Sequence, residues 1–551
     1  MKEKEQRYVI EDIICPFGIF YRYKKQFYII KDNSEVKYLT EEGQILRIDI
    51  TSTNQQAEVL KKWEQIVKLY WKGQHDTNRV KVGKWTATWQ GEIIKDVGGT
   101  YNNFGEKQGQ WKDLITNYWS LAQVYEVGKY QKGLRQGKWM FLYKDQEIGC
   151  GVYNLQGEKN GKWLELSNAF CENSKVSYIG EYYNGKKIGR WDIYFKYQGK
   201  NNKIGGGEYD QARKQRKIGQ WIDISDGFFE DSQITFHGDY KNGKKFGKWD
   251  IMFTWNGQNK IGGGLYDQHG EGLKIGKWID IYDQYQQNRQ ITYNGEYKNG
   301  KKVSRWDIWF NYIGKSNKMG GGSYDEQGQE LKVGSWLELS DGFCDSSQVT
   351  YNGEYEIGKK VGRWEAWFNK EGKNIKIGCG SYDEGGEGFK NGQWIDVHDQ
   401  YLDCRQVAYY GEYRFGKKVG RWEIRFEDNE IGGGWFDQAG EGLKNGQWID
   451  ISDGFYQESQ VTFHGEYQNG KKIGRWDIWY NKEGQNIKIG GGSYDEEGLG
   501  VKIGQWIEIS DQFDDYYEVT QKGKYQNGIK VGNWLENFRG FNKIKEIQYD
   551  N

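Results

Sequence analysis

The sequence predicts an all-β protein, built as an open, elongated single-sheet array of successive antiparallel β-hairpins with a small α+β cap at its N-terminus. Three observations lead to this fold class. The motif G-x-Y-x-N-G-K-K-x-G-x-W, as in residues 180–191, recurs along the chain, and a looser form, G-G-G-x-Y-D…G-x-W, alternates with it. The spacing of the motifs is regular, and each motif reads as a strand, a tight turn and a second strand. Self-similarity at a fixed period is the signature of a repeat architecture.

The tryptophan that closes each motif measures the period. The first series comprises Trp85, Trp139, Trp191, Trp249, Trp306, Trp364, Trp422, Trp476 and Trp534, and the second comprises Trp111, Trp163, Trp221, Trp278, Trp336, Trp394, Trp448 and Trp506. The step from a second-series tryptophan to the next first-series tryptophan is 28 residues every time, whereas the return step varies from 24 to 30. A fixed step indicates a fixed connection, and a variable step indicates a loop. The seventeen half-units therefore combine into composite units of about 58 residues.

One half-unit shows the strand and turn chemistry. Residues 233–240 alternate apolar and polar side chains, which is typical of a β-strand. Asn242-Gly243 follows, and this pair best tolerates the positive φ angles of a two-residue type I′ turn. Because side chains alternate with period two, such a turn would place Phe236 opposite Trp249 on one face of the hairpin.

Glycines and a second apolar face complete the expected sheet. Gly238 and Gly247 would oppose each other on the same face and leave bare backbone, which a neighbouring Tyr or Trp ring can cover. After Trp221, however, Ile222 and Ile224 point to the other face. We therefore expect the long loops or the curvature of the sheet to cover that second face.

This pattern resembles the MORN repeat, whose units read roughly Y-x-G-x-x-x-N-G-K-x-x-G-x-G and each form one β-hairpin. The departure is a tryptophan where that family usually has its last glycine, and this variant is similar to toxin–antitoxin YwqK-like repeats. The resemblance covers about residues 77–540, and it implies a scaffold, often associated with membranes. The matching residues in one repeat are Gly180, Glu181, Tyr182, Asn184, Gly185, Lys186 and Gly189, with Trp191 as the departure.

The repeat sets the domain organisation. We expect an N-terminal cap at residues 1–76, the array at residues 77–540 and a C-terminal tail at residues 541–551. In the cap, residues 55–70 read as a helix with Asn54 as N-cap, serving either to close the array or to dock a partner. The alternative architecture is an eight-bladed β-propeller, because a four-stranded period of about 58 residues also suits a blade.

Composition limits the function classes. The chain has 78 basic and 78 acidic residues, and this balance argues against binding to nucleic acid. No apolar run approaches the length of a membrane span, and the N-terminus lacks the apolar core of a secretory signal. We expect a cytoplasmic protein, with the cell cortex or a cilium as candidate locations.

No catalytic motif or metal-ligand spacing is found, so the sequence predicts no enzyme, cofactor or metal site. The histidines are His75, His237, His269, His398 and His464, and the scattered cysteines, expected to be free thiols, are Cys15, Cys150, Cys171, Cys344, Cys379 and Cys404. Acidic pairs follow the second-series tryptophans and resemble calcium ligands, although a calcium site needs about 6–8 converging oxygens. These pairs are Asp223/Asp226, Asp280/Asp283, Glu338/Asp341, Asp396/Asp399, Asp450/Asp453 and Glu508/Asp511.

Two rows of residues are candidate binding surfaces. A lysine pair follows each hairpin turn, and it either protects the turn and the edge or attracts an acidic partner or anionic lipid. These pairs are Lys186/Lys187, Lys244/Lys245, Lys301/Lys302, Lys359/Lys360, Lys417/Lys418 and Lys471/Lys472. Trp309, Trp367 and Trp479 lie opposite the repeat tryptophans and would form a partner groove if exposed.

The function predicted from these observations is a non-enzymatic scaffold for protein assembly, at a membrane or in a cytoskeletal or ciliary structure. The first alternative is a peripheral protein that binds anionic lipid such as phosphoinositides through the lysine pairs. The second is an antitoxin-like protein that holds one protein partner.

Overall fold

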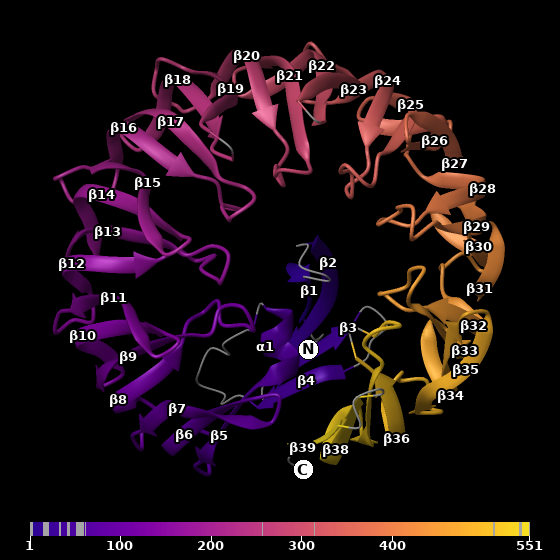
Figure 1. Cartoon of the computed structure of the whole chain (residues 1–551), viewed down its shortest axis with the longest axis horizontal. Helices are drawn as coiled ribbons and strands as arrows, with labels where there is room; N and C mark the ends of the chain where they lie inside the picture. Colours follow the sequence, from indigo (N-terminus) through magenta and orange to yellow (C-terminus); the bar gives the residue numbers. More distant parts are fainter. Residues whose placement is uncertain are drawn as a thin grey trace. The chain divides into compact units, whose positions relative to one another are not determined.

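The computed structural model describes residues 4–14, 21–31, 35–40, 45–50, 60, 62–255, 257–312, 314–510, 513–538 and 543–549. The chain divides into two compact units. Unit 1 comprises Met1–Lys81, Thr86–Lys95 and Arg363–Asn551, and unit 2 comprises Val82–Trp85 and Asp96–Gly362. Figure 1 labels most of the strands of both units.

The N-terminal elements belong to unit 1. Four strands form a small antiparallel sheet in chain order: β1 (Lys4–Ile14), β2 (Tyr21–Lys31), β3 (Glu35–Thr40) and β4 (Ile45–Ile50). The helix α1 (Trp63–Lys68) ends before residue 70, because Leu69 already begins a strand, and residues 55–59 of the predicted helix lie outside the described residues. Ile66 of α1 packs against Phe27, Ile29 and Tyr38 of this sheet. The predicted N-cap Asn54 lies outside the described residues.

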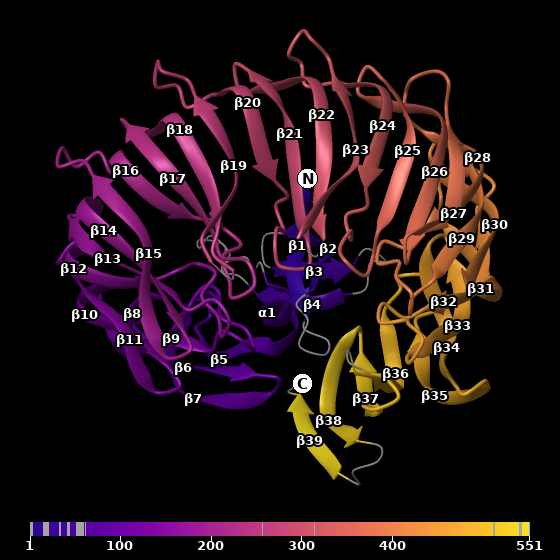
Figure 2. The ribbon, with the colours of Figure 1, turned by 45° about the horizontal axis from the view of Figure 1, so that its top comes forward.

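The structure confirms the array of successive hairpins. Strands β5 to β39 form one open antiparallel sheet in which each strand lies beside the next along the chain, without separate propeller blades. Figure 2 shows the strands from β20 to β25 side by side. The early strands are β5 (Leu69–His75), β6 (Lys81–Trp89), β7 (Glu92–Tyr101), β8 (Lys107–Leu114), β9 (Val124–Gln131), β10 (Leu134–Tyr143), β11 (Gln146–Tyr153), β12 (Lys159–Leu166), β13 (Val176–Tyr183), β14 (Lys186–Tyr197), β15 (Lys200–Tyr209) and β16 (Lys217–Ile224).

The middle strands are β17 (Ile234–Lys241), β18 (Lys244–Phe253), β19 (Asn259–Tyr266), β20 (Lys274–Ile281), β21 (Gln290–Lys298), β22 (Lys301–Tyr312), β23 (Lys315–Tyr324), β24 (Lys332–Leu339), β25 (Val349–Glu356), β26 (Lys359–Lys370), β27 (Lys373–Tyr382) and β28 (Lys390–Val397). The last strands are β29 (Val407–Arg414), β30 (Lys417–Phe426), β31 (Asn429–Phe436), β32 (Lys444–Ile451), β33 (Gln460–Gln468), β34 (Lys471–Lys482), β35 (Gln485–Tyr494), β36 (Lys502–Ile509), β37 (Val519–Gln526), β38 (Ile529–Phe538) and β39 (Lys543–Tyr549). Strand β39 pairs with β38, so the sheet continues beyond residue 540.

The turn between β17 and β18 has the predicted chemistry, but the register beyond it differs. Asn242 and Gly243 have φ angles of +51° and +82°, as a type I′ turn requires. A bulge then shifts the pairing, so that Phe236 lies opposite Ile251 and not opposite Trp249. Within the bulge Gly247 has a φ of +63°, a conformation that favours glycine. The predicted pairings of Phe236 with Trp249 and of Gly238 with Gly247 are therefore wrong.

Fifteen of the repeat tryptophans, those other than Trp85 and Trp364, are shown to lie over a glycine of the preceding strand, as expected for a ring that covers bare backbone. A Cβ atom added to Gly238 would come within 2.4 Å of the Trp249 ring, and one added to Gly207 within 2.2 Å of Trp221. Real Cβ atoms do not approach a ring that closely, so these positions require glycine. The repeat tryptophans are buried; Trp249, for example, is 1% exposed.

Tyrosines fill the spaces between the tryptophans and complete a ladder of rings. From Trp85 to Tyr355 in unit 2, neighbouring rings have centroids 5.0–6.5 Å apart and planes at 75–88° to each other. Unit 1 continues the same pattern from Trp364 to Tyr549, with Phe436 in one tyrosine position. Edge-to-face contacts of this kind favour aromatic pairing beyond the burial of area. We call this face of the sheet the tryptophan face.

The loops that follow the second-series strands form a second layer of the core. Phe228, in the loop after β16, packs against Val176, Ile193 and Phe195, and Ile224 joins the same cluster. Equivalent clusters surround Tyr285, Phe343, Phe455 and Phe513. The loop after β16 therefore covers part of Ile224, which remains half-buried.

Backbone hydrogen bonds also join these loops to one another. In unit 2 the N–H of Glu230 donates to the carbonyl of Asn173 at 3.0 Å, and that of Asp345 donates to Asn288 at 3.0 Å. In unit 1 the N–H of Gln457 donates to Cys404 at 2.8 Å. Within each unit, these bonds fix a loop to the loop one composite unit earlier.

Candidate functional site

The tryptophan face carries a repeated polar network of one lysine, one carboxylate and one tyrosine. The lysine that begins each second-series strand lies over the tryptophan ring, as Lys217 does over Trp221 at 4.3 Å. Its ammonium also pairs with the carboxylate two residues after that tryptophan, here Asp223 at 2.5 Å. The Tyr240 hydroxyl donates to the other oxygen of Asp223 at 2.7 Å. The first member of each predicted acidic pair is therefore already engaged within the sheet.

The length of the acidic side chain decides how many lysines it holds. An aspartate uses one oxygen for the lysine and the other for the tyrosine, as at Asp223, Asp280, Asp396 and Asp450. A glutamate accepts hydrogen bonds from both the lysine and the tyrosine at Oε1. Its Oε2 is then left for the second lysine of the following hairpin. The resulting pairs are Glu165 Oε2–Lys187 at 3.1 Å, Glu338 Oε2–Lys360 at 3.0 Å and Glu508 Oε2–Lys530 at 3.0 Å.

The structure separates the two lysines of each predicted pair. Second lysines lie over tryptophan rings on the tryptophan face, with ammonium-to-centroid distances of 3.8 Å for Lys187, 4.3 Å for Lys245, 4.6 Å for Lys302, 4.1 Å for Lys418 and 4.7 Å for Lys472. Lys360 lies near Tyr351 and Tyr355. Burial lowers the pKa of Lys187, Lys245 and Lys302 below the ordinary value. These side chains support the core and do not form a free basic surface.

First lysines lie at the turn edge. Lys186, Lys244, Lys301, Lys359 and Lys417 are exposed, and Lys471 is partly exposed. Some have local partners: Lys301 pairs with Glu330 at 3.2 Å, and Lys244 donates to the Glu271 carbonyl at 3.3 Å. The uniform row of twelve lysines predicted from the sequence thus divides into a partly buried set over the rings and a more exposed set at the turn edge.

The face opposite the tryptophan face carries an ionic group in most composite units. In unit 2, Asp307 pairs with Arg305 and with Lys318, each at 2.9 Å. Partial burial alone would raise the pKa of Asp307, but hydrogen bonds from these two cations outweigh it and lower that pKa. Trp309 lies two residues beyond Asp307 and directly opposite Lys318 on β23, where it is partly exposed.

The same arrangement recurs in unit 1. Glu365 pairs with Arg363 and Lys376, and Asp477 pairs with Arg475 and Lys488. Trp367 and Trp479 are partly exposed, and His464 packs beside Trp479 with ring centroids 5.7 Å apart. The three candidate groove tryptophans therefore lie on the predicted face, each beside two cations and one carboxylate.

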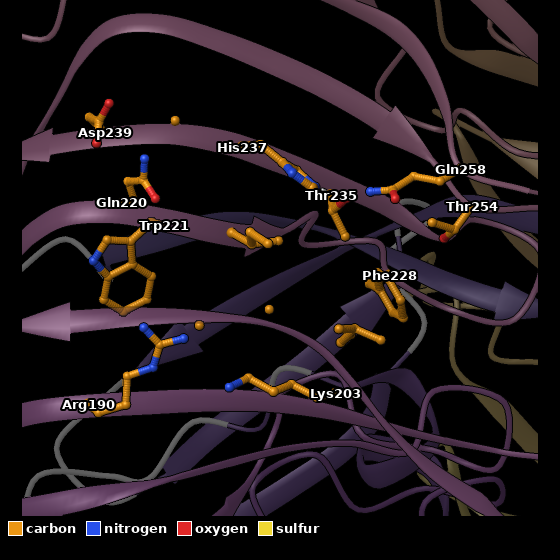
Figure 3. A pocket seen from close by; sticks show the side chains of 15 residues that line it. Arg190, Lys203, Gln220, Trp221, Phe228, Thr235, His237, Asp239, Thr254 and Gln258 are labelled. Carbon is orange, nitrogen blue, oxygen red and sulfur yellow. Dashed lines mark hydrogen bonds between the residues drawn. The ribbon is translucent and has the colours of Figure 1, made fainter.

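A hollow of about 770 Å³ opens on this opposite face of unit 2, where β15 and β16 part beyond Gly206. Figure 3 shows Arg190 and Lys203 on one side of it and His237 and Thr235 on the other. Both cations pair with Asp192, and His237 shares a hydrogen bond of 2.8 Å with Thr235. Most of the polar side chains that line the hollow thus already have hydrogen-bond or ion-pair partners. No sequence motif marks this position.

The remaining candidates lie apart from one another. No group of three or more His, Cys, Asp or Glu residues that could hold a metal occurs among the described residues. Asp226 is exposed at the start of its loop, away from the network that holds Asp223, and Asp511 lies outside the described residues. Cys150, Cys344, Cys379 and Cys404 are free thiols, Cys171 is partly exposed in the loop after β12, and Cys15 lies outside the described residues.

Comparison with protein-family models and with curated proteins finds no match for this sequence. Within the described part of the chain, no helix has the length and apolar character needed to cross a membrane.

Proposed function

We propose that this protein is a non-enzymatic scaffold that assembles protein partners on the face opposite the tryptophan face. The observation that supports the proposal is the repetition of one partly exposed group there: an arginine, a carboxylate, a tryptophan and a lysine. Two cations share one carboxylate in each group, so each copy has one excess positive charge. In one copy Arg305 is 54% exposed and Lys318 is 45% exposed.

The chemistry of this group favours an acidic, extended protein segment. Arginine and tryptophan are the residue types that most often anchor protein interfaces. Several equivalent copies in one chain raise the overall affinity for a partner with repeated acidic segments, without requiring a strong single contact. The resemblance to MORN repeats, which implies scaffolding, agrees with this proposal.

The test combines cross-linking at the natural locus with two matched sets of substitutions. One variant carries Trp309→Ala, Trp367→Ala and Trp479→Ala, and the control carries Lys244→Ala, Lys301→Ala and Lys417→Ala at exposed turn positions. We expect carboxyl-to-amine cross-links from partner proteins to Lys318, Lys376 and Lys488, lost in the tryptophan variant and retained in the control. Partner cross-links that persist unchanged in the tryptophan variant would overturn the proposal, as would loss in the control alone.

A further inference from the structure

Lys418 is the second lysine of a hairpin that follows an aspartate-containing second-series strand, and its local geometry differs from that of its glutamate-associated counterparts. The nearest carboxylate in the network is Asp396. One oxygen of Asp396 accepts a hydrogen bond from Lys390, and the other accepts one from the Tyr413 hydroxyl at 2.6 Å. Among the described residues, no carboxylate oxygen lies within 4.0 Å of the Lys418 ammonium.

The remaining surroundings of Lys418 are aromatic or cationic. Its ammonium lies 4.1 Å from the Trp422 centroid, 5.3 Å from Tyr409 and 5.7 Å from Phe436. The charged groups that face it are Asp396 and Lys390 from β28 and Lys444 from β32, and Lys444 pairs with Asp450 at 2.5 Å. The side chain remains partly exposed, so a small reagent can reach it.

Lys530 offers the contrast within the same unit. It also lies over a repeat tryptophan, 4.0 Å from the Trp534 centroid. Its ammonium, however, pairs with Oε2 of Glu508 at 3.0 Å, because Oε1 of Glu508 accepts both Lys502 and the Tyr525 hydroxyl. One additional methylene in the acidic side chain thus supplies a counter-ion to Lys530 that Lys418 lacks.

These differences have a chemical consequence, since a direct carboxylate partner stabilises the charged form of an amine and burial opposes it. The aromatic rings attract the ammonium. Burial nevertheless dominates at Lys418 and, together with the positive charges of Lys390 and Lys444, lowers its pKa to about 8. A substantial fraction of this side chain is then neutral near pH 8, whereas an ordinary lysine is almost entirely protonated there.

We propose that Lys418 is a reactive amine at which this protein accepts acyl groups from activated donors such as acyl thioesters, and that Lys245, Lys302 and Lys472, which share its arrangement, belong to the same class. The neutral Nζ attacks the thioester carbonyl and forms the C–N bond of an amide. The C–S bond breaks, the thiolate leaves with the bonding electron pair, and the proton lost from Nζ passes through water to the thiolate. The products are an acylated Lys418 and a free thiol.

The test is site-resolved acylation of the folded, full-length chain with a small acetyl thioester, read by peptide mass spectrometry between pH 7 and 9. At pH 8 we expect Lys418 to be acetylated about tenfold faster than Lys530, with a pH dependence that levels off above pH 8. The neighbouring Lys417, which is exposed at the turn edge, serves as the reference for a solvent-exposed lysine. A Lys418 rate equal to or below that of Lys530 would overturn the proposal.

A reciprocal pair of substitutions separates the counter-ion from simple exposure. Asp396→Glu should give Lys418 a carboxylate partner and reduce its rate to that of Lys530, while Glu508→Asp should raise the rate of Lys530. Equal amide-exchange protection of β28 to β30 in the native chain and in Asp396→Glu shows that the fold is retained. If Asp396→Glu folds normally and leaves the Lys418 rate unchanged, the geometric argument fails.

Discussion

The two layers of the core, the tryptophan ladder and the loop layer, differ in how far apart along the chain their contacting residues lie. In the ladder, a tryptophan such as Trp249 contacts a glycine and tyrosines of adjacent strands, all within one or two hairpins. In the loop layer, Phe228 closes a cluster from β13 to β16, and its carbonyl accepts a hydrogen bond from Ser174 Oγ at 2.6 Å, 54 residues earlier. The ladder therefore stabilises each hairpin locally, whereas the loop layer joins one composite unit to the next.

This difference teaches how an array of marginal hairpins becomes stable. A single two-stranded hairpin is marginally stable in water, and a repeat array gains most of its stability from the interfaces between neighbouring repeats. Damage to the loop layer should therefore spread to two composite units, while damage to the ladder should stay within one or two hairpins. Three substitutions test the comparison.

The largest effect should come from Phe343→Ala in the loop layer. Phe343 is fully buried, and its ring lies 5.2 Å from that of Phe310 in an edge-to-face contact. Truncation should cost about 3–5 kcal/mol of local stability, because it removes apolar contacts and leaves a cavity. Native-state hydrogen exchange should show lost protection in residues 340–348 and in the adjacent loop at residues 282–289. Leu265→Ala, at a position that is 49% exposed, is the control, and equal protection in both variants would contradict the role of the loop layer.

A smaller and more local effect should follow Gly465→Ala in the ladder. The new Cβ would lie 2.3 Å from the Trp476 ring, which must move and lose part of its packing. We expect a loss of about 2–3 kcal/mol, confined to the hairpin of β33 and β34, with a red shift of tryptophan fluorescence. Gly454→Ala is the matched control, since a Cβ atom added at Gly454 meets no atom within 4 Å. Equal stability of the two variants would show that the ring does not depend on the bare glycine.

The smallest effect should be a gain in stability from Phe236→Tyr, where the two layers meet. Phe236 packs against both the ladder and the cluster around Tyr285, and the nearby Ser225 hydroxyl is buried without a hydrogen-bond partner. In the preceding composite unit, Tyr178 at the equivalent position is hydrogen-bonded to Ser167.

The added hydroxyl of Phe236→Tyr should satisfy Ser225 and raise the free energy of unfolding of this region by about 1 kcal/mol, measured by hydrogen exchange. The gain should disappear when Ser225→Ala is combined with it. A gain that survives the double change would mean that the hydroxyl acts elsewhere.

The turn and ladder chemistry of the fold followed from sequence because it is local. Asn242-Gly243 specifies its turn through backbone conformation alone, and the glycines had to be covered by rings that are abundant in the same motif. The register beyond the turn did not follow, since the bulge at Gly247 inserts residues that no alternation pattern reveals. The helix predicted over residues 55–70 extended too far at its C-terminal end for a related reason: Tyr70 fits a helical stripe equally well but lies in strand β5.

For the candidate surfaces, the sequence by itself determined which residues repeat and that Trp309, Trp367 and Trp479 face away from the repeat tryptophans. The tertiary structure alone decided that Lys417 is exposed while Lys418 lies over Trp422, and that Asp396 leaves Lys418 without a partner where Glu508 supplies one to Lys530. The physical reason is that repetition fixes the order of side chains along a strand. Burial and pairing, in contrast, depend on side chains of the neighbouring strands, and a difference of one methylene changes which oxygen can reach which ammonium.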